Sequence, residues 1–457
     1  MMELHNHVAA VQDKLLACLQ ENLKIPSVQG PAEPGAPYGS HVRRCLDHVL
    51  NAAEELGFRT ENVDGHLGWC EYGDGEEMIA VLGHLDVVPA GDGWTVDPYG
   101  GEISDGMVWG RGTTDDKGPT IAALFALAAL RDSGLPIRRR IRLLFGCNEE
   151  TGSADVKYYL SQGGEVPVMG FTPDAEFPVI NGEKGIITVS FGSSYSQDGE
   201  VKLISIEGGT AANVVPDYAC AKIACCPLCA ARLSSLQATG LHFTPTEYGL
   251  LLEARGVSAH GSTPEQGENA IGRLLLALDT LPFSQDLADK IHFLATHIGM
   301  ESDGTSAGIH LHDQVSGSLT LNLGTLYADE QYMTMKINYR YPVTFSYVDC
   351  GPVLNDTFQA AGFQVENEFH KEKLYMAEDS ELVQTLLKIY KEETGLEGKA
   401  KCIGGGTYAK SLPNILAFGP VFPGEEAREH KPDEYITVDN LMKNTRILAS
   451  AMYAMAK

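Results

Sequence analysis

The sequence predicts an α/β fold in which a mixed sheet is covered by helices on both faces, with a second, α+β domain inserted into the first. Along the outer parts of the chain, short apolar runs that indicate buried strands alternate with helical patterns. The middle of the chain changes to closely spaced strand-like segments. We therefore expect one domain from residues 1–185 and 368–457, and an inserted domain from residues 186–367.

Four apolar runs predict the buried strands of the first domain. They are Met78–Gly83, Ile141–Gly146, Val168–Phe171 and Asn414–Gly419. The predicted helices are Met1–Lys24, Ser40–Gly57, Pro119–Arg131 and Val438–Met455. Pro119 lies near the first turn of its helix, where proline is favoured. Strands that alternate with helices in this way are typical of a sheet covered on both faces.

The predicted insert contains strand-like and helical segments in mixed order, which is typical of an α+β domain. The strand-like segments are Ile186–Phe191, Val201–Glu207, Tyr248–Gly256, Ser318–Leu326 and Tyr332–Tyr341. The two helical segments are Cys229–Leu236 and Asn269–Leu281. The chain then returns to the first domain for its last strand and its terminal helix.

The 457 residues carry a net charge of −27, which repels nucleic acid and anionic membrane surfaces. No apolar run approaches the roughly 20 residues that span a bilayer. Near the N-terminus, charged residues such as Asp13 and Lys14 interrupt any signal-peptide core. We therefore expect no nucleic-acid partner, no membrane partner and a cytoplasmic location.

Four of the ten cysteines cluster at Cys220, Cys225, Cys226 and Cys229. Cys226 and Cys229 have the spacing of a zinc or redox pair, but no second pair follows at a matching distance. We favour small buried apolar residues near a helix start. A thiol oxidoreductase that uses Cys226 and Cys229 remains an alternative.

Ionisable residues follow each predicted buried strand of the first domain. His84 and Asp86 follow the first strand, Glu149 and Glu150 the second, Asp174 the third, and His430 lies in the loop beyond the fourth. Because ligands of such sheets bind beyond the carboxyl ends of the strands, we expect these residues to converge on one edge. Imidazole and carboxylate groups are the ligands that divalent metals use in hydrolytic sites.

Each of these residues also has an ordinary structural interpretation. A histidine in a loop is commonly polar surface, and Glu149 and Glu150 alone would indicate a solvated pair. Asp115 and Asp116 precede the helix that starts near Pro119, so they could equally act as its N-cap. Convergence of all these residues on one sheet edge makes the ordinary interpretations jointly improbable.

Seven motifs resemble the aminoacylase, carboxypeptidase G and succinyl-diaminopimelate desuccinylase family of co-catalytic metallohydrolases. They are Gly83–Pro89, Trp109–Gly118, Asn148–Ser153, Thr172–Glu176, Gly256–Ser262, Gly404–Tyr408 and His430–Glu434. Within the family, the chain is most similar to the monomeric bacterial dipeptidase branch. The resemblance implies two divalent metal ions, zinc first and manganese or cobalt as alternatives.

The resemblance also implies a role for each residue at the sheet edge. His84 and Asp174 would bind one metal, Glu150 and His430 would bind the other, and Asp115 would bridge them. Asp86 would orient His84. Glu149 would act as general base, taking a proton from the metal-bridging water and passing it to the leaving amine. A cis peptide bond between Asp115 and Asp116 is also expected.

In this resemblance, the insert is a lid that completes the site within a monomer. His260 would donate to the oxyanion, and Asn213 and Arg340 would lie near a dipeptide substrate. Gly404, Gly405 and Gly406 would let the backbone approach a ligand closely. Alternatives remain for His260, as a surface histidine, and for Arg340, as half of a structural salt bridge.

A dipeptidase is therefore the predicted function. An N-acyl-amino-acid deacylase with the same mechanism is the nearest alternative, because the ligand residues do not distinguish the two substrates. A non-catalytic relative is disfavoured because neither a ligand nor Glu149 is missing from the sequence.

Overall fold

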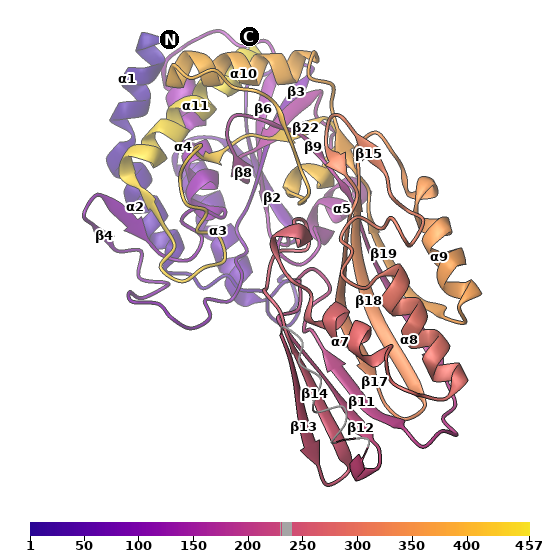
Figure 1. The fold of residues 1–457 in the computed structure, drawn as a ribbon. Coiled ribbons are helices and arrows are strands. Elements are labelled where there is room, and N and C mark those ends of the chain that lie inside the picture. Colours follow the sequence, from indigo (N-terminus) through magenta and orange to yellow (C-terminus); the bar gives the residue numbers. More distant parts are fainter. Residues whose placement is uncertain (229, 231–239) are drawn as a thin grey trace. The chain divides into compact units, whose positions relative to one another are not determined.

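The computed structural model describes residues 1–228, 230 and 240–457. The chain divides into two compact units, which are coloured along the sequence in Figure 1. Unit 1 consists of Met1–Asn181, Met376–Lys401 and Gly406–Lys457. Unit 2 consists of Gly182–Tyr375 and the short segment Cys402–Gly405. The main segment of unit 2 interrupts unit 1 in the chain, at positions close to the ends of the predicted insert.

A mixed nine-stranded sheet has the strand order β1-β2-β6-β3-β7-β22-β9-β20, in which β21 also pairs with β9, and most of its strands lie in unit 1, whereas β20 belongs to unit 2. Its four central strands are parallel: β6 (Arg140–Gly146), β3 (Met78–His84), β7 (Met169–Thr172) and β22 (Ile415–Ala417). These are the four predicted buried strands. The other strands are β1 (Arg59–Val63), β2 (Leu67–Tyr72), β9 (Ile180–Glu183), β20 (Leu374–Tyr375) and β21 (Lys401–Ile403).

Helices cover both faces of this sheet, as the sequence predicts. Gly83 of β3 faces α4, since a Cβ at Gly83 would lie 2.0 Å from the Thr120 hydroxyl. Successive residues of a strand face opposite sides, so His84 faces away from α4 and packs against the Tyr408 ring. Tyr408 in turn hydrogen bonds to Asp155 of α5. The elements involved are α4 (Lys117–Asp132), α5 (Ala154–Ser161) and the 3-10 helix η3 (Tyr408–Ser411).

The N-terminal segment forms two helices, so the prediction of one helix over Met1–Lys24 is wrong. α1 (Met2–Ala10) and α2 (Gln12–Leu23) meet at Val11, whose amide donates to the Val8 carbonyl. Both helices contact α4, but α1 also contacts α11, whereas α2 also contacts α3. The apolar face is continuous in the sequence, but the two halves share only one of the helices against which they bury it.

The remaining elements of unit 1 complete the covering layers and the loops. They are α3 (Ser40–Glu55), α10 (Glu381–Thr394), α11 (Val438–Ala456), β4 (Ile103–Ser104), β5 (Met107–Trp109), β8 (Ala175–Glu176), β23 (Pro420–Val421) and β24 (Tyr435–Thr437). β24, β5 and β4 form a small sheet of their own, and β23 pairs with β8. Within the described part of the chain, no helix combines the length and apolarity needed to cross a membrane.

Unit 2 is built on an eight-stranded antiparallel sheet with the order β13-β14-β12-β11-β17-β18-β10-β19. Five of its strands were predicted: β10 (Gly185–Ser194), β11 (Lys202–Gly208), β14 (Gly249–Arg255), β17 (Thr320–Ala328) and β18 (Tyr332–Tyr341). Three were not: β12 (Tyr218–Ala224), β13 (Leu241–Thr246) and β19 (Gln364–Lys371). A short pair, β15 (His312–Asp313) and β16 (Gly317–Ser318), lies apart from this sheet.

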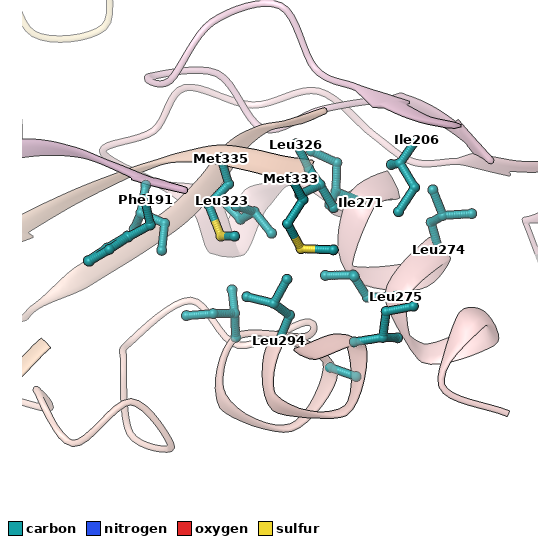
Figure 2. Close-up of a cluster of buried hydrophobic side chains, with 14 of the residues drawn as sticks. Phe191, Ile206, Ile271, Leu274, Leu275, Leu294, Leu323, Leu326, Met333 and Met335 are labelled. Carbon is teal, nitrogen blue, oxygen red and sulfur yellow. The ribbon is translucent and has the colours of Figure 1, made fainter. Parts of the chain in front are cut away.

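The core of unit 2 lies between this sheet and its helices. Figure 2 shows Met333 and Met335 of β18 and Leu323 of β17 in one cluster with Leu274 and Leu294 from two helices. The helices are α7 (Ala270–Leu278), which was predicted, α8 (Gln285–His297) and α9 (Gly351–Ala360). Short 3-10 turns lie at η1 (Pro264–Gln266) and η2 (Tyr347–Asp349).

The predicted helix Cys229–Leu236 lies outside the described residues, except for Ala230, and Cys229 lies outside them too. The prediction that the cysteine cluster is buried is wrong for Cys226, which is exposed. Cys220 and Cys225 are half-buried, and burial raises the pKa of both thiols. A raised pKa favours the protonated, less reactive form of these two thiols. It does not test the alternative of a thiol oxidoreductase, which would use Cys226 and Cys229.

Leu274→Ala should lower the free energy of unfolding by about 2–5 kcal/mol, because a fully buried leucine leaves a cavity when it is truncated. Urea unfolding measures this. Leu276→Ala is the matched control, since Leu276 lies on the same helix and is 47% exposed. An equal loss of unfolding free energy in the two variants would contradict a core that contains Leu274 but not Leu276.

Candidate metal centre

The parallel strands carry their ionisable residues to one edge of the unit 1 sheet. His84 is the last residue of β3, Glu149 and Glu150 lie in the turn after β6, and Asp174 follows β7. Asp115 lies two residues before α4. Because β3, β6 and β7 run in the same direction, their carboxyl ends coincide, and the side chains that follow them share one site.

Asp115 lies between two histidines. Its Oδ1 is 3.0 Å from His84 Nε2, and its Oδ2 is 3.0 Å from His430 Nε2. Asp174 Oδ1 is 3.8 Å from His84 Nε2, and Glu150 Oε2 is 3.3 Å from His430 Nε2. Two groups of three ligands result, His84–Asp115–Asp174 and Asp115–Glu150–His430, in each of which the ligand atoms lie within 4.8 Å of one another. The two groups share Asp115.

The chemistry of this cluster fits divalent cations. The buried Oε1 of Glu150 has no hydrogen-bond partner among the described residues. Burial, opposed in part by the neighbouring histidines, raises the pKa of Asp174 and Glu150 above the usual range. Carboxylates that raise one another's pKa in a buried site need positive charge to remain ionised together. Two imidazoles and three carboxylates are suitable ligands for two such ions.

The peptide bond between Asp115 and Asp116 is cis, which confirms that prediction. Asp116 occupies the N-cap position of α4, yet its side chain makes no hydrogen bond to the first-turn amides. Instead, Asp116 Oδ2 accepts from the His84 amide at 3.1 Å and from the Thr120 hydroxyl at 2.9 Å. The N-cap interpretation is therefore correct for the position of Asp116, but its side chain does not cap the helix.

Asp86 connects both sides of the cluster. Its backbone carbonyl accepts from His84 Nδ1 at 2.9 Å, and its carboxylate lies 3.5 Å from the same nitrogen. The two carboxylate oxygens accept from the amides of Glu149 and Glu150, each at 3.1 Å. With Nδ1 donating to Asp86, the neutral His84 ring leaves Nε2 as an acceptor for a metal. Asp86 therefore fixes the turn that carries Glu149 as well as the His84 ring.

Glu149 lies beside the candidate metal ligands without belonging to either group. Burial, with the negative charge of Asp174 second, raises the pKa of Glu149 well above its usual range. A carboxylate that is driven toward its protonated form accepts a proton readily. This position and this chemistry suit a proton acceptor next to a metal-activated nucleophile.

Sequence reasoning missed Glu434, a fully buried carboxylate that holds the loop before α4. It accepts from the amides of Gly112 at 3.2 Å, Thr114 at 2.8 Å and Asp115 at 3.3 Å. It also accepts from Arg111 Nη1 at 2.7 Å. Burial raises the pKa of Glu434 to about 7. The last residue of the motif His430–Glu434 was the only available signal, and the sequence gives no indication of its partners.

Tyr408 and Asp155 form a second support that sequence reasoning missed. The Tyr408 hydroxyl donates to Asp155, its ring packs edge-on to the His84 ring, and its amide donates to Asp174 Oδ2 at 3.2 Å. Asp155 also accepts from the amides of Cys147 at 2.6 Å and Asn148 at 2.9 Å. Burial raises the pKa of Asp155 to about 6. The pair thus contacts one ligand, His84, through a ring, and another, Asp174, through a backbone amide.

The predicted substrate residues lie in unit 2, with the exception of Gly406. The Gly261 amide donates to the Asn213 carbonyl at 2.7 Å, which places His260 beside Asn213. Arg340 Nη1 donates to the Gly404 carbonyl at 2.7 Å. Gly404 approaches Ser262 so closely that a Cβ at Gly404 would lie 2.9 Å from the Ser262 Cβ. Gly405 belongs to the same unit, whereas Gly406 belongs to unit 1.

Arg340 is buried, and burial lowers its pKa to about 10. Its Nε donates to Asn338 Oδ1 at 3.3 Å. Among the described residues of its own unit, no acidic side chain forms an ion pair with Arg340. The alternative of a structural salt bridge within this unit therefore has no support, and the guanidinium remains able to bind an anion.

Comparison with known proteins gives one family for most of the chain. Residues 80–454 match the model of peptidase family M20/M25/M40. A protein of Bacillus subtilis (strain 168) described as "Putative dipeptidase YtjP" is 39% identical over 462 residues, which cover 98% of each chain. A protein of Staphylococcus haemolyticus (strain JCSC1435) described as "Putative dipeptidase SH1171" is 34% identical, again over 98% of each chain.

Solved structures share the fold at low sequence identity. The dipeptidase Dug1p from Saccharomyces cerevisiae gives a TM-score of 0.61 at 13% identity and covers 100% of this chain and 98% of its own. Human carnosine dipeptidase 1 gives a TM-score of 0.57 at 15% identity and covers 99% of each chain. The family match and the similarity of the whole chain to its relatives agree with the ligand groups at the sheet edge, and the chain belongs to the peptidase family M20/M25/M40.

Proposed function

We propose that this protein is a dipeptidase that uses two divalent metal ions. The observation that carries the proposal is the shared carboxylate: Asp115 lies 3.0 Å from each of two imidazoles, which belong to separate ligand groups. The relatives that resemble the whole chain are described as dipeptidases. His84 and Asp174 would hold one ion, Glu150 and His430 the other, and Asp115 both, with zinc as the first candidate metal.

The bound ions would polarise the scissile carbonyl and lower the pKa of the attacking water. Glu149 takes the proton from that water and later returns it to the leaving amine, so that the bond between carbonyl carbon and amide nitrogen breaks with no net proton change at Glu149. Asp86 keeps Glu149 in place through the amide of that residue. Held by the backbone in this way, Glu149 needs little rearrangement during turnover.

Unit 2 supplies the groups that recognise the substrate in this proposal. His260 donates a hydrogen bond to the oxyanion that forms at the carbonyl, and Arg340 binds the free carboxylate of the dipeptide. Asn213 and Gly404–Gly406 lie along the substrate. We further propose that these groups act as a lid within a single chain, that the protein is a monomer, and that it works in the cytoplasm, where its thiols stay reduced.

A substrate panel tests the reaction and its metal dependence together. The protein is stripped with a chelator and reloaded with zinc, manganese or cobalt before it is given dipeptides, tripeptides and N-acetyl amino acids. Dipeptides should be hydrolysed, activity should return only with metal, and metal analysis should give two ions per chain. Full activity in the stripped protein would contradict the metal mechanism, and faster hydrolysis of N-acetyl amino acids would indicate a deacylase instead.

Glu149→Gln should reduce turnover by roughly 10²–10⁴-fold, the usual value of a general acid–base group, while both metals remain bound. The amide side chain has the same shape but does not accept the proton. Glu150→Gln is the control: it should weaken metal binding, because Glu150 belongs to a ligand group. Titration calorimetry and turnover measurements distinguish the two, and loss of metal from Glu149→Gln alone would show that the roles are reversed.

Arg340→Ala should raise KM for dipeptides by roughly 10–100-fold, the equivalent of one hydrogen bond to a charged group. Dipeptide amides, which lack the carboxylate, should change little. Arg340→Lys keeps the charge but not the planar fork of the guanidinium. Its KM for dipeptides should therefore lie between those of the wild-type protein and Arg340→Ala. A Tm for each variant controls for the buried position of Arg340. An equal effect on dipeptides and their amides would contradict carboxylate binding.

A further inference from the structure

Ser262 lies two residues after His260 and contacts its ring twice. The Ser262 hydroxyl is 2.6 Å from His260 Nδ1, and the Ser262 amide is 3.4 Å from the same nitrogen. Among the described residues of unit 2, His260 Nε2 has no hydrogen-bond partner. The two ring nitrogens therefore have different environments: one is held by its own loop, and the other is available to a ligand.

The contact with the amide decides which nitrogen carries the proton in the neutral ring. A backbone N–H only donates, so Nδ1 must accept in this arrangement. The Ser262 hydroxyl, which can donate or accept, then donates its hydrogen to the same lone-pair side of Nδ1. In the neutral imidazole the proton consequently resides on Nε2, where it can be donated to an oxygen.

The neutral form is favoured at His260. Burial, followed by the positive charge of Arg340, lowers the pKa of His260 below its usual value. A protonated ring would also direct an N–H from Nδ1 at the amide of Ser262. Both effects favour a ring that donates from Nε2 without carrying a charge.

Hydrogen bonds fix the backbone around His260, so only the side-chain torsions that orient the ring remain free to vary. His260 forms an isolated β-bridge with Val214, and its carbonyl accepts from the Thr263 amide at 2.9 Å. The ring is only partly buried, and His260 as a whole keeps enough contact with solvent to count as exposed. An exposed histidine exchanges rotamers freely unless a hydrogen bond restrains it. The Ser262 hydroxyl provides that restraint, and Gly404 packs against Ser262.

We propose that Ser262 is a positioning residue, which holds the His260 ring in the tautomer and the orientation that present the Nε2 hydrogen to the oxyanion of the substrate. This inference rests on the proposed function, because the oxyanion belongs to peptide hydrolysis. Ser262 itself does not contact the reacting atoms. Because of Ser262, the ring already has the required orientation and tautomer before the catalytic step, which is a form of preorganisation.

Ser262→Ala tests this role, because it removes the hydroxyl and leaves the amide in place. Turnover of the best dipeptide should fall by roughly five- to tenfold, the rate equivalent of one hydrogen bond, while KM changes less than about twofold. Ser262→Thr, which keeps the hydroxyl, should restore turnover. Ser258→Ala is the matched control, since Ser258 lies in the same loop and its hydroxyl has no hydrogen bond to the described residues of unit 2. Metal content should be the same in all four proteins.

Nitrogen NMR of histidine-labelled protein reads the tautomer without any substrate, with His260 assigned by comparison with His260→Ala. In the wild-type protein Nδ1 should be unprotonated and Nε2 protonated, and Ser262→Ala should show a mixture. A protonated Nδ1 in the wild-type protein at neutral pH, or unchanged turnover in Ser262→Ala, would overturn the inference. If the wild-type protein hydrolyses no substrate on the panel, the proposed function fails, whereas the NMR result still decides whether Ser262 sets the ring.

Discussion

The carboxylate of Asp115, held between the imidazoles of His84 and His430, is the interaction on which the site depends. It brings two ligand groups together at one partly buried position, and it brings the charges of Asp174 and Glu150 with them. Removing several carboxylates from water costs free energy unless positive charge accompanies them. Bound cations would therefore stabilise this group of side chains. Without cations, the surrounding polypeptide must hold the repelling carboxylates in place.

Three buried carboxylates hold the loops that carry these ligands. Asp86 accepts from the amides after β6, Asp155 accepts from amides closer to that strand, and Glu434 accepts from amides before α4. The backbone amides of loops at strand ends do not take part in the hydrogen bonds between strands. Buried amides of this kind need another acceptor. The two oxygens of a carboxyl group can accept several N–H donors, so one such group can order several successive residues. The ligands thus gain fixed positions although they lie outside regular secondary structure.

The positions of the candidate ligands could be predicted from the sequence better than those of the residues that support them. His84, Glu149 and Asp174 each follow a buried apolar run, and this local signal is sufficient to place them at one sheet edge. Asp155 and Glu434 have no comparable local signal, because their importance comes from amides and side chains far away in the chain. The relative positions of such partners depend on tertiary packing, which periodicity does not encode.

The errors in the fold have similar causes. The split of the N-terminal helix at Val11 reflects which helices each half packs against, and nothing in the local pattern indicates it. β19 was missed because it lies at the edge of its sheet, and its mostly polar residues show no clean alternation of buried and exposed positions. Edge strands carry the weakest apolar signal of a sheet, since much of their surface faces water.

Within the described part of the chain, the two units carry uncompensated charges of opposite sign. In unit 1 the ligand groups concentrate negative charge, and Glu150 keeps a buried oxygen without a partner among the described residues. In unit 2 Arg340 is a buried cation whose pKa burial lowers to about 10, with no acidic partner among the described residues of that unit. Metal ions would compensate the first charge. An anion would compensate the second, and the guanidinium of Arg340 is suited to a carboxylate. A dipeptide carries a free carboxylate only a few bonds from its peptide carbonyl, whereas an internal segment of a longer chain does not, and this is one reason why we propose a dipeptide as the substrate.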